Sequence, residues 1–108
     1  MTLKNFEFYD APHVAFLFMP KIGDGIAVAN DIGMYAQNFL LSLTARGFGG
    51  IPMLTLGMFA KQVKEILGVP DDLQLLYGIS FGVPDWDAQP NKEHLGRIDI
   101  SESVTIHR

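Results

Sequence analysis

Between Ile26 and Arg46 the chain reads IAVANDIGMYAQNFLLSLTAR, and this stretch decides the fold. Apolar residues recur at helical spacing, which predicts one long helix. The apolar positions are Ala29, Ile32, Ala36, Phe39, Leu40 and Leu43 on one face and Val28, Met34, Tyr35 and Leu41 on the others. Amides and hydroxyls keep the stretch short of the ~18 consecutive apolar residues of a membrane span. We therefore expect a helix that is buried on nearly all sides.

The length of the chain limits what can bury that helix. The 108 residues, 48% of them hydrophobic, leave room for a single domain covering residues 1–108. A lone domain of this size buries roughly 60–70% of the surface that its unfolded chain exposes. The helix is therefore expected to find part of its cover outside the chain.

Composition argues against several classes of function. Twelve acidic and eight basic residues give a net charge of -4 without a basic cluster, so no nucleic-acid partner is expected. There is no cysteine, and His13, His94 and His107 share no ligand spacing, so no metal site is expected either. The first residues, MTLKNFE, lack the apolar core of a signal peptide, and we expect a soluble, cytoplasmic protein with no membrane span.

The segments around the helix predict an α+β fold. An unbroken apolar run, HVAFLFM, covers His13–Met19 and predicts a strand in the middle of a sheet. Leu73–Phe81 predicts a second buried strand, and Ser103–His107 a short edge strand. Met58–Leu67 predicts an amphipathic surface helix that Gly68 ends. We interpret Gly47–Pro52 as a glycine-rich loop after the long helix.

Two motifs have both a functional and a structural interpretation. Gly78–Gly82 reads GISFG and matches the nucleophile elbow of serine hydrolases, but Val83 and Pro84 do not favour the helix that the elbow requires. A strand that leaves through a glycine turn is the favoured interpretation. Gly23–Val28 reads GDGIAV and has valine where a dinucleotide-binding motif has its third glycine, so a turn with Asp24 as a helix cap is favoured.

Two further features suit a flavin but have ordinary explanations. Glycines in Gly47–Pro52 would let backbone N–H groups approach a flat ligand, although glycine clusters after helices are more often caps and turns. Arg97 offers a guanidinium fork that suits a phosphate, although an arginine in a tail is more often solvated.

The order and spacing of these segments resemble the nitroreductase family. The resembling segments span nearly the whole chain: Asp10–His13, Asp31–Asn38, Ala45–Pro52, Leu67–Pro70 and Leu76–Asp85. Each segment consists of common residues, but their joint order makes the resemblance more specific than any one of them. The resemblance covers the carboxyl-terminal half of the family's domain.

The resemblance implies an α+β homodimer with a flavin mononucleotide (FMN) at the subunit interface. NAD(P)H would reduce the flavin, which would then reduce a nitroaromatic or quinone acceptor. The long helix would lie in the core and in the dimer interface. Ile51, Pro52, Met53 and Leu54 match the family's contact with the flavin ring, and Arg97 matches its carboxyl-terminal phosphate contact. Because the flavin supplies the hydride chemistry, no catalytic side chain is implied.

The resemblance also leaves an alternative open. The family's amino-terminal arginine and serine cluster, which holds the flavin phosphate, would precede Met1 of this sequence. We therefore expect a truncated oxidoreductase with a weakened flavin site. The alternative is a non-catalytic, self-associating domain, a pseudo-enzyme or regulatory remnant, whose apolar helix is an interaction surface.

Overall fold

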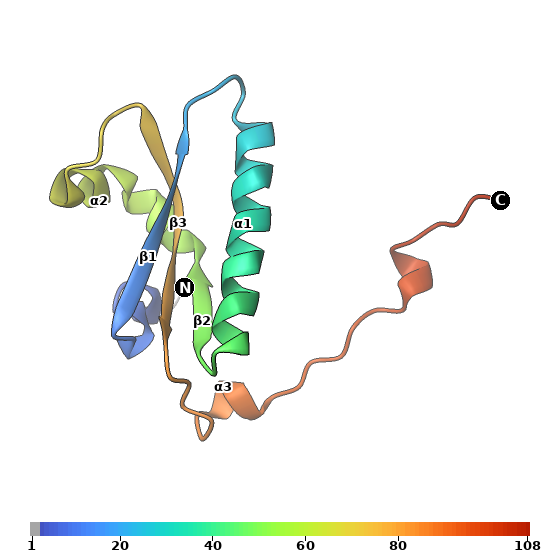
Figure 1. The fold of residues 1–108 in the computed structure, drawn as a ribbon. Coiled ribbons are helices and arrows are strands. Elements are labelled where there is room, and N and C mark those ends of the chain that lie inside the picture. The colour runs from blue at the N-terminus through green and yellow to red at the C-terminus, as the bar shows by residue number, and fades with distance from the viewer. Residues whose placement is uncertain (1–2) are drawn as a thin grey trace.

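The computed structural model describes residues 3–108 as a small sheet with helices against it (Figure 1). In chain order the strands and α-helices are β1 (His13–Pro20), α1 (Ile26–Ala45), β2 (Gly49–Met53), α2 (Ala60–Leu67), β3 (Leu73–Gly82) and the short α3 (Gln89–Lys92). The 3-10 helices are η1 (Leu3–Asn5), η2 (Phe8–Asp10), η3 (Leu54–Phe59) and η4 (Ile100–Glu102). The predicted α+β class is confirmed.

The sheet has the strand order β1-β3-β2, and both pairings are antiparallel. β3 is the central strand, and its Ser80 lies between Val14 of β1 and Ile51 of β2. The prediction that the first strand lies in the middle of the sheet is therefore wrong for this chain. A continuous apolar run cannot distinguish a central strand from an edge strand whose faces are covered, and most β1 side chains are half-buried.

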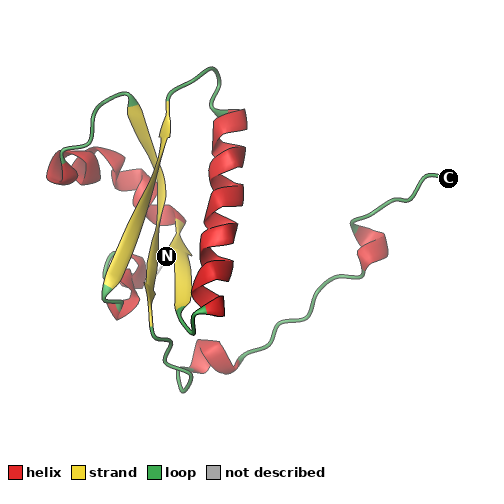
Figure 2. Ribbon diagram, viewed as in Figure 1, coloured by secondary structure: helices red, strands yellow, loops and turns green. Residues whose placement is uncertain are grey.

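Helices cover both faces of the sheet. Figure 2 shows α1 along one face and α2 on the other. Two glycines allow these layers to come close: a Cβ on Gly50 would lie 2.9 Å from Leu43 Cδ1 of α1, and one on Gly78 would lie 2.8 Å from Leu56 Cδ1 of η3. The buried apolar side chains are Met19, Ala36, Leu43, Met53, Leu56, Leu75 and Ile79.

Both ends of α1 follow the sequence expectations. The Asp24 carboxylate accepts a hydrogen bond of 3.0 Å from the backbone N–H of Ile26, which satisfies one of the unpaired donors of the first turn. Gly47 adopts φ +79°, a backbone conformation that other residues rarely adopt, and donates to the carbonyl of Thr44. The turn interpretation of Gly23–Val28 is thus confirmed, but Gly25 rather than Asp24 occupies the N-cap position of α1.

Removal of the Asp24 carboxylate, which accepts from the first turn of α1, provides a first test of this account. Asp24→Ala is expected to lower the free energy of unfolding by about 1 kcal/mol, because the N–H of Ile26 loses its acceptor. The measurement is urea denaturation followed by circular dichroism. Asp31→Ala, which removes an exposed carboxylate within the same helix, is the matched control and should change stability by less than about 0.5 kcal/mol. Equal losses in the two variants would contradict the capping role.

Within this chain α1 is covered on one side only. Ala36 and Leu43 are its buried side chains, whereas Met34 and Leu41 are 57% and 58% exposed. Ala27, Met34 and Leu41 are seven residues apart, so they lie nearly above one another on the side away from the sheet. We call these three residues the outer stripe of α1.

Three other segments differ from the sequence expectations. The glycine-rich segment is mostly a strand, because Gly49–Met53 pairs with β3. The expected edge strand at Ser103–His107 is absent, and the tail after α3 leads away from the sheet with only η4 as regular structure (Figure 1). The expected second helix divides into η3 and α2, and its Ile66 is 83% exposed. In the described residues no helix has the length and hydropathy needed to cross a bilayer.

Candidate functional site

The four residues that match a flavin-ring contact lie where β2 ends and η3 begins. β2 is an edge strand, and an edge tolerates Pro52, which has no N–H to donate. Met53 is fully buried and anchors the segment in the core. Its neighbours Ile51 and Leu54 are 41% and 70% exposed. The structure therefore presents Ile51, Pro52 and Leu54 at the surface and holds them in place through Met53.

Thr55, the next residue, carries a buried hydroxyl. Its Oγ1 atom is shielded from solvent and has no hydrogen-bond partner among residues 3–108. A buried hydroxyl without a partner costs about 1–3 kcal/mol relative to a satisfied one. Sequence reasoning did not single out Thr55, because spacing and composition cannot show whether a hydroxyl finds a partner.

Arg97 lies on the tail, whose first part leads away from the sheet (Figure 1). Within residues 3–108 its guanidinium donates to neighbouring backbone carbonyls, those of Leu95 at 3.4 Å and Gly96 at 3.2 Å. Asp99 is occupied elsewhere, because its carboxylate accepts hydrogen bonds from the backbone N–H and the hydroxyl of Ser101, which lower its pKa. Arg97 and the Ile51–Leu54 segment are thus not brought together within the described residues of one chain.

One hollow in the described part of the chain has a volume of about 760 Å³. It lies between the amino-terminal turns, the adjoining ends of β2 and β3, and the segment 83–91. Of the five residues predicted to bind a cofactor, Ile51 alone lines it. Ser80 also lines it, with a side chain that is buried and without a hydrogen-bond partner in the described residues.

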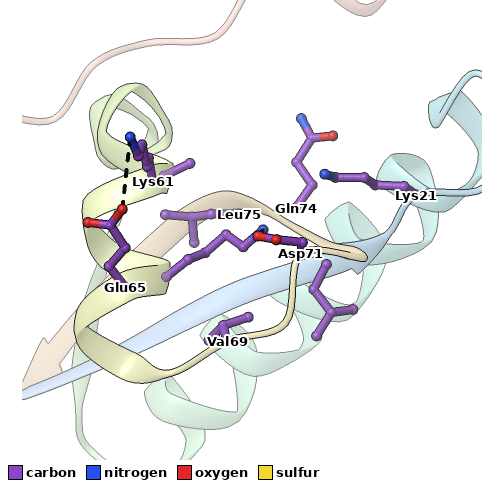
Figure 3. Close-up of a pocket in the computed structure, with 10 residues that line it drawn as sticks. Lys21, Lys61, Glu65, Val69, Asp71, Gln74 and Leu75 are labelled. Carbon is purple, nitrogen blue, oxygen red and sulfur yellow. Dashed lines mark ion pairs between the residues drawn. The ribbon is translucent and has the colours of Figure 1, made fainter.

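A second hollow, of about 560 Å³, separates α2 from the start of β3 (Figure 3). None of the residues predicted to bind a cofactor lines it. Its charges are largely paired: Lys61 lies 4.0 Å from Glu65, and the Lys64 ammonium lies 3.6 Å from Asp71. The Lys61–Glu65 pair is exposed, whereas the Lys64 side chain is 13% exposed and its ammonium is directed to the exposed carboxylate of Asp71.

The GISFG segment does not form the strand-to-helix elbow of a serine hydrolase. Ser80 lies inside β3, and a turn rather than a helix follows Gly82, so the strand interpretation of GISFG is confirmed. In the part of the chain that the structure describes, no group of three or more histidine or acidic side chains is arranged to hold a metal ion.

Comparison with known proteins agrees with this architecture. The family model described as "Nitroreductase family" matches residues 1–83. Nitroreductase NfnB of Mycolicibacterium smegmatis is 39% identical over 105 residues, which are 97% of this chain and 44% of that protein. An NADPH-flavin oxidoreductase of Vibrio harveyi is 42% identical over 57 residues, 53% of this chain and 24% of that protein.

Solved structures give the same result. The crystal structure of the FMN-dependent nitroreductase NfnB from Mycobacterium smegmatis in complex with NADPH superimposes with a TM-score of 0.89 at 38% identity. The match covers 97% of this chain and 46% of that one. The chain therefore spans about half the length of the relatives that it matches. On the family model, the sequence identity and the fold together, the chain belongs to the nitroreductase family.

Proposed function

We propose that this chain forms part of an FMN-dependent, nitroreductase-type oxidoreductase that passes electrons from NAD(P)H to a nitroaromatic or quinone acceptor. In this proposal Ile51–Leu54 borders the flavin ring and Arg97 binds the flavin phosphate. The observation that carries it is the match to the FMN-dependent NfnB over 97% of this chain. A bound flavin would supply the hydride chemistry, and the protein would position it.

The residues present fit such a group. The exposed Ile51 and Leu54 side chains offer an apolar edge for a flat ring, and the Thr55 hydroxyl beside them lacks a partner in residues 3–108. A polar ring atom could satisfy that hydroxyl. Arg97 has donors that its two neighbouring carbonyls do not satisfy, which suits a phosphate. The Asp99 carboxylate accepts from Ser101 instead of pairing with this guanidinium.

A titration of the purified chain with FMN tests the proposal. Saturable quenching of FMN fluorescence is expected, and Arg97→Ala is expected to weaken binding at least tenfold, because a charge-assisted hydrogen bond contributes about 1.5–3 kcal/mol. Arg108→Ala, which removes an exposed arginine from the same tail, is the matched control and should leave the affinity unchanged. Absence of saturable binding at high FMN concentration would remove the oxidoreductase proposal for this chain.

We further propose that a second copy of the chain covers the outer stripe of α1. Apolar residues seven positions apart form the seam along which two helices pack, and Met34 and Leu41 are more than half exposed. Exposed apolar side chains on the tail add surface of the same kind: Leu95, Ile98, Ile100, Val104 and Ile106. Light scattering should therefore give the mass of a dimer. A dimer without affinity for FMN would favour the non-catalytic alternative.

A further inference from the structure

A left-handed turn lies just before β1. Phe8, Tyr9 and Asp10 have φ values of +53°, +54° and +58°. Residues other than glycine visit this region as single residues, because the Cβ atom then crowds the following carbonyl oxygen. For a residue such as tyrosine the cost corresponds to roughly five- to thirtyfold in an equilibrium constant. Such strain persists only where surrounding contacts hold it, and it is common at ligand clamps and switches.

Two aromatic contacts hold the turn against the rest of the chain. The Phe8 ring meets Phe16 of β1 edge to face, with the ring centroids 6.2 Å apart. Phe6 meets Phe59 of η3 in the same manner at 5.2 Å. Aromatic pairs of this geometry stabilise a structure beyond their buried area. We call residues 3–11 the amino-terminal lid, which these contacts hold against β1 and η3.

An ion pair closes the lid on itself. The Lys4 ammonium lies 2.7 Å from the Asp10 carboxylate and 3.7 Å from that of Glu7. The hydrogen bond to Asp10 raises the pKa of Lys4. All three side chains are more than half exposed, and exposed ion pairs contribute little to stability. The ion pair therefore shapes the lid, whereas the aromatic rings hold it in place.

Pro12 fixes the carboxyl end of the lid. A Cβ on Gly82 would lie 2.7 Å from Pro12 Cδ, so the proline ring packs directly on β3. Ala11, between the turn and Pro12, is extended with φ -73° and ψ 144°. Hinges are formed by a few loop residues that absorb a change in φ and ψ. The strained residues lie next to a fixed point, so a change in their angles would move the lid.

The lid forms one wall of the hollow of about 760 Å³. Lys4, Tyr9, Asp10 and Ala11 line the hollow from the lid, and the segment 83–91 lines it from another side. The lid contributes no strand to the sheet, so its movement would leave the pairing of β1 with β3 intact. Access to the hollow therefore depends on the position of the lid.

We propose that the amino-terminal lid opens and closes over this hollow, with the strain of the left-handed turn favouring the open form. In the closed form, which the structure describes, the two aromatic contacts offset the strain. In the open form residues 8–10 take ordinary backbone angles and the rings of Phe6 and Phe8 leave their partners. A segment with these two states would control entry to the hollow. The lid needs no flavin, because the contacts that hold it closed lie within this chain.

Tyr9→Gly and Tyr9→Val test the role of the strain. Both substitutions remove the tyrosine ring, but glycine adopts positive φ freely and valine rarely does. The backbone N–H groups of Asp10 and Ala11 donate to the carbonyls of Glu7 and Phe8, so their hydrogen exchange reports opening of the turn. NMR of the flavin-free chain should show exchange about tenfold faster in Tyr9→Val than in Tyr9→Gly. Equal rates in the two variants would overturn the proposal.

Phe8→Ala tests the contact that closes the lid. It removes the ring that meets Phe16, while alanine is strained at positive φ as phenylalanine is. Exchange at Asp10 and Ala11 should become about fivefold faster, and the amides of β3 should keep their rates. Trp86→Ala, which changes another wall of the same hollow, is the matched control and should leave the exchange of the lid unchanged. Unchanged lid exchange in Phe8→Ala, or faster exchange throughout β3, would contradict a lid that moves separately from the sheet.

Discussion

Ile79→Ala is expected to lower the free energy of unfolding by about 2–5 kcal/mol, the range measured when a buried isoleucine loses its side chain. Ile79 is fully buried in the central strand, where its cross-strand partners are Ala15 and Pro52. Its Cγ2 atom would lie 3.3 Å from a Cβ on Gly50, so the Ile79 side chain packs closely against β2. Domains of this size are stable by about 5–15 kcal/mol, and the variant should lose a large part of that margin.

Urea denaturation followed by circular dichroism measures this loss. Ile66→Ala is the matched control, because Ile66 undergoes the same chemical change at a position that is 83% exposed. Its stability should change by less than about 0.5 kcal/mol. Similar losses at the two positions would mean that β3 is not the core of the fold. An unaltered stability of Ile79→Ala would contradict the packing described here.

The elements with strong local signals could be predicted from the sequence. The predicted long helix and the strand predicted at Leu73–Phe81 match the observed α1 and β3 within one residue at each end, and the run that begins at His13 forms β1. α1 has apolar residues at helical spacing, β1 and β3 are mostly apolar, and a glycine or proline lies at the end of each element or within two residues of it. Local propensity and long-range packing favour the same structure there, so a pattern in the sequence is sufficient.

Pairing between strands was harder to predict than the strands themselves. β2 contains Gly49, Gly50 and Pro52, which have low strand propensity, and it exists because β3 offers it hydrogen-bonding partners. The sequence pattern therefore favoured a loop. The edge position of β1 has the same cause, since strand order depends on contacts between segments that are far apart along the chain.

The candidate sites divide in a similar way. The family resemblance identified Ile51–Leu54, and the structure places its residues at the end of the edge strand beside η3. The sequence singled out Ser80 only as part of GISFG. The structure shows instead that its buried hydroxyl has no hydrogen-bond partner in the described residues. Satisfaction of a buried hydroxyl depends on the three-dimensional surroundings, which no spacing of residue types reveals.

Leu41→Arg is expected to convert the proposed dimer to a monomer, with a dissociation constant raised at least a hundredfold. Leu41 lies in the outer stripe of α1 and is 58% exposed in the single chain. Association through a two-fold axis would bring the stripe of one copy against that of the other. The interface would therefore contain two copies of each substituted residue. The change removes apolar contact and buries an unpaired charge, and both effects weaken the same interface.

Light scattering and sedimentation over a range of protein concentrations measure this shift. Ile66→Arg is the matched control, because Ile66 on α2 is more exposed than Leu41 but lies outside the outer stripe. The Ile66→Arg variant should remain a dimer. A dimer that persists in Leu41→Arg would contradict α1 as the interface, and dissociation of both variants would show that any apolar surface promotes association. Because Leu41 projects away from the sheet, the monomeric variant should keep the circular dichroism spectrum of the unmodified chain, which separates loss of association from loss of fold.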